Sequence, residues 1–247
     1  MIATGLITGS GGLPLLARLA EREADLVTPF GPVPGPVRSG RPGDCRLIGI
    51  PRHGDPHQLA PHAVNYRANL WLLKELGAKR IVATYTVGAI AGGLQPGDLV
   101  LPEQIVDYTW GRAHTFDETG SLHVDFTVPF DAELARQFAA VSERMGQSVV
   151  RGGVYGCAQG PRLETAAEID RMERDGCTLV GMTAMPEAAL ARELGVPLLG
   201  ICIVVNPAAG RGPDPTRIDH EALARDQATG LSRADRLIRA FCGDESG

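Results

Sequence analysis

The run Leu198–Val205 (LLGICIVV) contains no polar side chain, and it constrains the fold more than any other segment. It is far shorter than the roughly 20 apolar residues that a membrane helix needs. Its β-branched content predicts a strand, and a strand without polar residues is typical of a sheet covered on both faces. We therefore expect helices on either side of a central sheet.

Similar short apolar runs alternate with segments of helical period along the whole chain. The predicted strands are Ile2–Thr8, Arg46–Ile50, Ile81–Thr86, Leu99–Asp107, Gly153–Cys157, Thr178–Met182 and Leu198–Val205. The predicted helices are Leu13–Glu23, His62–Gly77, Asp131–Gly146, Glu164–Asp175, Pro186–Gly195 and Pro215–Phe241. This alternation predicts an α/β fold, a single-domain sandwich with a central mixed, largely parallel sheet flanked by helices. Because no linker or repeat interrupts residues 1–247, we expect one domain.

Three stretches lack a clear period. Thr28–Gly43 is rich in Pro and Gly and is either an ordered loop or an edge hairpin. Thr109–Phe130 contains His114 and His123. Asn206–Pro215 is glycine- and proline-rich and directly follows the most hydrophobic strand. Ligands of open α/β sheets bind beyond the carboxyl ends of strands, so this last loop is a natural place for a site.

Composition narrows the class of protein. The formal net charge of −5 argues against nucleic-acid binding, which normally needs a basic face. The five cysteines form no CxxC pair, so neither a disulfide framework nor a zinc ribbon is expected. The N-terminus has no basic flank before its glycine-rich turn, unlike a signal peptide. We expect a soluble, cytoplasmic protein with no nucleic-acid or membrane partner.

The segment Gly9-Ser10-Gly11-Gly12 follows the first predicted strand and precedes a helix. Successive backbone N–H groups and a serine hydroxyl at such a place suit an anion. The segment lacks the spacing of a dinucleotide fingerprint and the GK[ST] ending of a P-loop. An anion site and a plain tight turn are both consistent with it.

Arg52 and His53 also follow a predicted strand directly. Arginine is the side chain best shaped to clamp phosphate through two parallel hydrogen bonds. The alternative is a solvated surface loop. We expect no metal at His53, His57 and His62, because intervening prolines break any common helical face and no further ligand completes the set.

Two further strand-to-helix junctions carry polar residues. Glu164 or Thr165 could begin the helix that follows, or Glu164 could accept a hydrogen bond from a ligand. Thr183 could likewise cap the next helix or contact a ligand.

Taken together, the chain resembles the trimeric purine nucleoside and methylthioadenosine phosphorylases. The resemblance runs from Ile7 to about Asn206, and the motif sequences are most similar to those of bacterial methylthioinosine phosphorylases. Its motifs are TGSGGL (8–13), PRHG (51–54), VNYRANLWLLKELGA (64–78), TVG (86–88), QPGDLVLPEQIVDYT (95–109), QGPRLET (159–165) and GMTAMPEAALARELG (181–195). Seven motifs in this order are highly specific.

The resemblance implies a role for individual residues. Those implied to bind phosphate are Ser10, Arg52, His53, Thr86 and Thr183. Met182 corresponds to a methionine that packs on the ribose, and His123 to a histidine that one subunit lends to its neighbour's site. His123 would therefore act only across an interface of a homotrimer. No cofactor is implied, since inorganic phosphate is a co-substrate.

The implied base pocket contains Val87, Gly88, Leu163, Glu164 and Asn206. Relatives that act on adenosine-type substrates have Ser and Asp at the last two places, whereas those that act on 6-oxopurines have Glu and Asn. Glu164 can accept from N1–H of a 6-oxopurine, and the Asn206 amide can donate to O6 while its oxygen accepts from N7–H. Adenine would leave these groups mispaired, and each mispaired buried group costs about 1–3 kcal/mol of binding free energy. Leu163 replaces a phenylalanine that stacks on the purine in many relatives.

The 5′ end of the ribose is less defined. His220 lies fourteen residues after Asn206, the spacing at which purine nucleoside phosphorylases place a histidine on the 5′-hydroxyl. It is equally consistent with a solvent-facing histidine in a helix capped by Asp214, with Pro215 at its first position. A methylthio group and a hydroxyl group therefore both remain open.

The expected function is phosphorolysis of 6-oxopurine nucleosides, either 5′-methylthioinosine or inosine and guanosine, by Asn206, His53 and Arg52. The product would be a free base and a ribose 1-phosphate derivative. The alternative enzyme is a methylthioadenosine phosphorylase. A purine-binding sensor on the same fold is the non-enzymatic alternative. A nucleotide-dependent oxidoreductase is less consistent, since residues 38–46 provide no convincing acidic partner for a ribose.

Overall fold

The computed structural model describes residues 2–23, 26–214 and 220–243. The strands are β1 (Ala3–Thr8), β2 (Ala20–Glu23), β3 (Val27–Thr28), β4 (Gly31–Pro32), β5 (Val37–Gly40), β6 (Arg46–Pro51), β7 (Arg80–Ala89), β8 (Leu99–Leu101), β9 (Gln104–Asp107), β10 (Val150–Arg151), β11 (Val154–Cys157), β12 (Leu179–Gly181) and β13 (Leu198–Pro207). The helices are α1 (Pro14–Ala17), α2 (Tyr66–Glu75), α3 (Ala132–Arg144), α4 (Ala166–Arg174), α5 (Ala184–Glu193) and α6 (His220–Phe241), with a 3₁₀ turn at Pro61–Ala63.

The central sheet is mixed and has a parallel centre, as predicted. Its main path runs β10-β8-β13-β7-β1-β6-β5-β2, and β13, β7, β1 and β6 are mutually parallel along it. The outer strands β5 and β8 run antiparallel to their inner neighbours. At its far end β7 also pairs with β12, which brings β11 and β9 into the same sheet.

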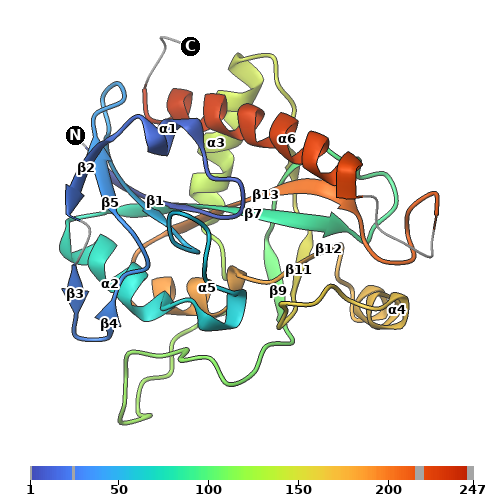
Figure 1. Ribbon diagram of the computed structural model, residues 1–247, viewed down its shortest axis with the longest axis horizontal. Coiled ribbons are helices and arrows are strands. Elements are labelled where there is room, and N and C mark those ends of the chain that lie inside the picture. The colour runs from blue at the N-terminus through green and yellow to red at the C-terminus, as the bar shows by residue number, and fades with distance from the viewer. Residues whose placement is uncertain (1, 24–25, 215–219, 244–247) are drawn as a thin grey trace.

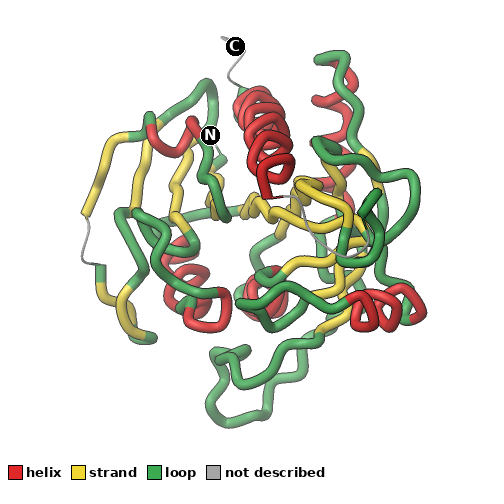
Figure 2. The backbone as a smooth tube through the Cα atoms, turned by 45° about the vertical axis from the view of Figure 1, so that its right-hand side comes forward, coloured by secondary structure: helices red, strands yellow, loops and turns green. Residues whose placement is uncertain are grey.

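Helices cover both faces of this sheet (Figure 1). One layer contains α1, α3 and α6, and the other contains α2 and α5, while α4 lies beside the β9-β11-β12 part of the sheet. Figure 2 shows the same layers from a second direction. None of the helices in the described residues is long and apolar enough to cross a bilayer.

Strand β13 shows why the chain contains a purely apolar run. Leu199, Ile201 and Ile203 point into the core beneath α1, α3 and α6. Cys202 and Val204 point into the opposite core, beneath α2 and α5. Because successive side chains of a strand alternate between faces, two covered faces require apolar residues at every position.

The helix predicted over Leu13–Glu23 is wrong in its second half. Pro14 at the first position starts a helix, but that helix ends at Ala17. Ala20–Glu23 instead forms β2, an edge strand paired antiparallel with β5. The segment AERE has good helix propensity, yet backbone pairing with β5 decides its conformation. Propensity is a weak prior that tertiary contacts override.

The strand predicted over Leu99–Asp107 is two strands. Pro102 lacks a backbone N–H and interrupts the ladder. Before it, β8 pairs antiparallel with β13, and after it β9 pairs parallel with β11. Within Thr28–Gly43, β4 pairs with β3 in a small hairpin and β5 joins the main sheet, so the edge-hairpin interpretation holds.

Two other boundaries differ. The helix predicted from His62 begins at Tyr66, where the Asn65 side chain accepts from the Ala68 N–H. The helix predicted from Pro215 is described from His220 onward, and Pro215 itself lies outside the described residues. The stretch 109–130 has no regular secondary structure, as expected.

Candidate active site

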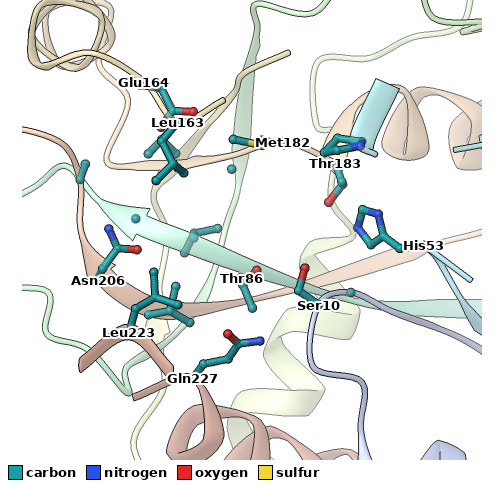
Figure 3. Close-up of a pocket in the computed structure, with 18 of the residues that line it drawn as sticks. Ser10, His53, Thr86, Leu163, Glu164, Met182, Thr183, Asn206, Leu223 and Gln227 are labelled. Carbon is teal, nitrogen blue, oxygen red and sulfur yellow. The ribbon is translucent and has the colours of Figure 1, made fainter. Parts of the chain in front are cut away.

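A cavity of about 250 Å³ lies at the carboxyl ends of the four adjacent parallel strands β6, β1, β7 and β13. Each strand contributes the residues at or just beyond its end, which explains why segments distant in sequence meet here (Figure 3). The turn after β12, the segment before α4 and one face of α6 complete the wall. The lining residues that had been expected from the sequence are Ser10, Arg52, His53, Thr86, Val87, Gly88, Leu163, Glu164, Met182, Thr183 and Asn206.

The glycine turn after β1 forms one wall of the cavity. The Gly12 N–H donates to the Gly9 carbonyl, and both Gly11 and Gly12 have positive φ angles, of 84° and 60°. A side chain at residue 11 would also collide with Gln227 and Leu231 of α6. The segment is therefore a tight turn, and this turn places the Ser10 hydroxyl at the cavity (Figure 3).

Arg52 is wholly buried, and its guanidinium already has protein partners. Its Nε and Nη2 donate to the two carboxylate oxygens of Glu187, each at 2.8 Å, and Nη1 donates to the Thr84 carbonyl at 3.0 Å. The sequence predicts that two-pronged contact to phosphate. In the structure it is made to a carboxylate, and Arg52 contributes to the cavity through its remaining edge.

His53 has a defined tautomer. Its Nδ1 lies 2.8 Å from the Leu59 carbonyl, which can only accept, so Nδ1 carries the proton and Nε2 has a free lone pair. The ring stacks on His57 with centroids 4.3 Å apart. Burial, together with the charge of Arg52, lowers the pKa of His53 to about 4, so the ring is neutral at physiological pH.

Thr183 occupies the N-cap position of α5, but its side chain makes no capping hydrogen bond. The helix therefore leaves the hydroxyl free, and it points into the cavity on the same side as Ser10 and His53 (Figure 3). Thr86 of β7 lies between these three residues and the opposite end of the cavity. Beside it, Gly88 faces Val180 and Ala208, which a Cβ at residue 88 would approach to 3.2–3.3 Å.

Glu164 lies at the other end of the cavity, next to Leu163 (Figure 3). The N-terminus of α4 does not need it, because Thr165 and Glu168 form a reciprocal capping box. Its Oε1 is buried without a hydrogen-bond partner among the described residues, and burial raises the pKa of the carboxyl. A buried acceptor without a partner is the property expected of a group that binds a ligand N–H.

Asn206 faces Glu164 from the end of β13 (Figure 3). A β-bulge between Val204 and Asn206 shifts the register against β7, so that Asn206 pairs with Gly88. A bulge re-aims the side chains that follow it. The Asn206 Nδ2 donates to the Pro207 carbonyl at 2.5 Å, which leaves its second N–H and its amide oxygen available.

The residues that the resemblance implies to contact ribose do not all lie in the cavity. Met182 lines the cavity between its two ends, packed against Gly160. His123 is exposed on the 109–130 loop and is not part of the cavity of its own chain. His220 begins α6, but its side chain lies outside the described residues, as does Pro215 of the proposed cap.

Several cavity residues escaped the sequence analysis. Leu223 and Gln227 lie one helical turn apart on α6 and close one side (Figure 3). Their four-residue spacing places them on one helix face, but the sequence does not show that this face covers a cavity. Glu187, which holds Arg52, lies within a recognised motif without any local sign of burial. His57 also lines the cavity. Within the described residues, no cluster of three His, Cys, Asp or Glu side chains could hold a metal ion.

Comparison with known proteins identifies the family. The model of the phosphorylase superfamily matches residues 3–242. A "probable S-methyl-5′-thioinosine phosphorylase" of Xanthomonas campestris is 48% identical over 216 residues, which cover 85% of this chain and 86% of that protein. One from Xylella fastidiosa is 45% identical over 240 residues, with 96% of both chains covered.

A "probable 6-oxopurine nucleoside phosphorylase" of Moorella thermoacetica is 42% identical over 197 residues, covering 78% of this chain and 75% of that one. Among solved structures, methylthioadenosine phosphorylase from Schistosoma mansoni in complex with adenine superposes with a TM-score of 0.89 at 27% identity. That match covers 98% of this chain and 91% of the other. The chain therefore belongs to the phosphorylase superfamily.

Proposed function

We propose that this nucleoside phosphorylase cleaves 6-oxopurine nucleosides with inorganic phosphate, and that its substrate is S-methyl-5′-thioinosine. The observation that carries the proposal is the pairing of Glu164 with Asn206 at one end of a cavity whose other end gathers hydroxyl and imidazole groups. One end suits a 6-oxopurine and the other suits an oxyanion. The names of the relatives from Xanthomonas, Xylella and Moorella support the same substrate class.

At the base end, the donors and acceptors match a 6-oxopurine. Ionised Glu164 accepts from N1–H, and this hydrogen bond supplies the partner that its buried Oε1 lacks. The free N–H of Asn206 donates to O6, and its amide oxygen accepts from N7–H. Adenine presents a lone pair at N1, which an ionised carboxylate repels. The preference for the 6-oxo group follows from leaving Glu164 unpaired in the adenine complex.

At the other end, the hydroxyls of Ser10 and Thr183, with Thr86 and Arg52, hold phosphate below the ribose. The neutral His53 accepts a hydrogen bond through Nε2 from a protonated oxygen of phosphate. A phosphate oxygen forms a bond to the anomeric carbon while the bond from that carbon to the purine nitrogen breaks. The base leaves with the bonding electrons and takes up a proton from solvent at N7, and the ribose 1-phosphate derivative remains.

The transition state of such a reaction resembles an oxocarbenium ion, as in glycoside hydrolysis. Phosphate beside the sugar stabilises its positive charge, while Asn206 stabilises the negative charge that develops on the purine. Because both interactions strengthen as the glycosidic bond breaks, they lower the barrier rather than only tighten substrate binding.

The 5′ substituent would lie toward α6, where Leu223 offers an apolar side chain to the cavity. An apolar contact suits a methylthio group better than a hydroxyl group. Met182 packs on the ribose in this arrangement. His220 would favour inosine instead if its side chain reached the 5′-hydroxyl.

The active form would be a homotrimer in which His123 completes the site of a neighbouring subunit. The loop 109–130 that carries His123 extends away from the body of the chain (Figure 2). It exposes the large apolar side chains of Trp110, Leu122 and Val128, at 73%, 51% and 43%. Large apolar side chains exposed along one loop fit a surface that packs against another chain.

Initial rates with S-methyl-5′-thioinosine, inosine and S-methyl-5′-thioadenosine, each with and without phosphate, test the proposal. We expect phosphate-dependent release of hypoxanthine, with the highest kcat/KM for the methylthio nucleoside. A higher kcat/KM for inosine would mean that the preferred substrate has a 5′-hydroxyl group and not a 5′-methylthio group. A higher value for methylthioadenosine would contradict the 6-oxopurine preference. Purine binding without any phosphate-dependent cleavage would indicate a sensor.

Two substitutions test the base pocket with the same substrates. Asn206→Ala should lower kcat/KM for the 6-oxopurine by about tenfold or more, because the leaving base loses both hydrogen bonds. Glu164→Gln should reduce the ratio of 6-oxo to 6-amino activity by about tenfold, since the new amide can donate to N1 of adenine. Gln137→Ala, which removes an exposed amide on α3, is the matched control and should leave all rates unchanged. Unchanged kinetics for Asn206→Ala would exclude its assigned role.

A further inference from the structure

The phosphate end of the cavity rests on a buried network that the sequence analysis did not anticipate. Glu187 is wholly buried, and each of its carboxylate oxygens accepts from the Arg52 guanidinium at 2.8 Å. The Tyr85 hydroxyl donates to the same carboxylate, also at 2.8 Å. The Tyr85 ring lies under the guanidinium, with 4.8 Å from the guanidinium carbon to the ring centre. Arg52 is thus held at its edge and on its face.

The number of N–H groups indicates what Arg52 can still offer a ligand. A guanidinium has five N–H donors. Glu187 occupies two of them and the Thr84 carbonyl a third, so one N–H remains on Nη1 and one on Nη2. Nη1 lies against the glycine turn, because a Cβ at residue 9 would be only 2.9 Å from it. The remaining Nη1 donor therefore lies beside the turn that carries Ser10.

The network also determines the charge at this end. Burial by itself would lower the pKa of Arg52, but the charge of Glu187 outweighs that effect and raises it. The ion pair has no net charge, and the neighbouring His53 is neutral. Net positive charge therefore contributes little to holding an anion here. Affinity for phosphate must come from hydrogen-bond donors held in fixed orientations. Charge-assisted hydrogen bonds are strong when their donors are oriented in advance.

We propose that Glu187 is a positioning residue that orients the Arg52 guanidinium toward phosphate, with the Tyr85 hydroxyl fixing the carboxylate in turn. The inference rests on the phosphorolytic function proposed above. An arginine side chain loses rotamer entropy when it is fixed. Because Glu187 fixes Arg52 in the folded protein, this entropy is lost during folding and not when phosphate binds. Neither Glu187 nor Tyr85 needs to touch phosphate.

Steady-state kinetics of Glu187→Gln and Tyr85→Phe test the role, with phosphate varied at saturating nucleoside and nucleoside varied at saturating phosphate. Glu187→Gln should raise the KM for phosphate about tenfold or more, because an amide cannot accept both prongs of the fork. Tyr85→Phe should raise it by about two- to fivefold, since it removes one hydrogen bond and keeps the ion pair. The KM for nucleoside should change by less than about twofold in both.

Two controls separate orientation from a general loss of structure. Ser142→Ala removes a buried hydroxyl of α3 that donates to the Gln147 carbonyl and does not line the cavity, so it should leave both KM values unchanged. The double variant Arg52→Lys/Glu187→Gln should lose little more phosphate affinity than Arg52→Lys alone, because Glu187 acts through the arginine fork. Additive losses would contradict that route.

The outcomes are distinct. If both Tyr85→Phe and Glu187→Gln fold, as judged by circular dichroism, and keep the wild-type KM for phosphate, the positioning role is wrong while the proposed function stands. If the two KM values rise together, Glu187 supports the fold rather than the phosphate site. If Glu187→Gln does not fold, the Tyr85→Phe result decides. If the wild-type protein cleaves nucleoside without phosphate, both proposals fail.

Discussion

His53 shows how strongly its surroundings change the chemistry of one residue. An exposed histidine titrates near pH 6.5, but burial and the adjacent Arg52 lower the pKa of His53 to about 4. The hydrogen bond from Nδ1 to the Leu59 carbonyl then fixes the tautomer. The residue can accept from a ligand at neutral pH, and it cannot contribute a positive charge there. The sequence indicated a histidine near an anion, but not its charge.

The lowered pKa of His53 predicts a pH-dependent stability. Between pH 6.5 and 4 the unfolded chain binds a proton at this histidine and the folded chain does not, so acid favours unfolding. The contribution of His53 to the free energy of unfolding is fully present above pH 6.5 and decreases as the pH falls toward 4. Between pH 7 and pH 5 the decrease should be about 2 kcal/mol.

Urea unfolding of the wild type and His53→Gln at pH 7 and pH 5 measures this effect. The wild type should lose about 2 kcal/mol more than the variant over that interval. The carboxyl of Glu164, whose pKa is raised, is present in both proteins and cancels in the comparison. Equal losses in the two proteins would mean that His53 titrates normally in the folded state.

At the level of elements, the walls of the cavity depend on an arginine in an irregular segment. Arg112 is buried, and its guanidinium donates to the carbonyls of Gln159 at 2.9 Å and Met182 at 2.9 Å. It also donates to the carbonyl of Met185 at 2.5 Å. One side chain thereby joins the segment before α4 to the turn after β12, which carry Glu164 and Met182. A loop without secondary structure thus positions both walls at the end of the cavity that contains Glu164.

Replacing this arginine should affect nucleoside binding more than phosphate binding. Arg112→Met leaves several buried carbonyls without donors, which we expect to destabilise the fold by about 2–4 kcal/mol. The KM for nucleoside should rise more than the KM for phosphate, because the contacts lie at the nucleoside end. Arg112→Lys should recover part of both losses. Thermal unfolding and the two KM values are the measurements, and equal changes in both KM values would refute a local effect.

At the scale of the whole molecule, the structure of one chain leaves His123 outside its own cavity. The proposed homotrimer accounts for this, because the loop 109–130 carries exposed apolar side chains that another copy would cover. Residues shared across an interface can be recognised by complementation between two inactive variants.

Co-expression of His123→Ala and Asn206→Ala tests the exchange. In a cyclic trimer, each His123→Ala subunit next to an Asn206→Ala subunit has an intact site, so about a quarter of all sites should recover in a random mixture. Each variant alone should be impaired. Sedimentation velocity reports the assembly independently. No recovery in mixed trimers would mean that His123 does not act in trans, and a monomer would remove the basis of the proposal.

The sequence by itself determined the layered α/β architecture, because alternating apolar strands and amphipathic helices have few other ways to bury their surfaces. It also placed most polar cavity residues at strand ends, where parallel strands bring their carboxyl ends to one edge. It could not predict that Ala20–Glu23 forms a strand, because the partner β5 is distant in sequence from a segment of helical propensity.

Only the tertiary structure decided how the site residues are used. The bulge in β13 aims Asn206 at Glu164, and its register depends on pairing with β7. The Arg52 fork binds Glu187, a residue 135 positions away, which no local pattern connects to it. Helix α6 closes the cavity with Leu223 and Gln227. Local patterns report which side chains a segment buries, whereas partners, charge states and orientations arise from contacts between distant segments.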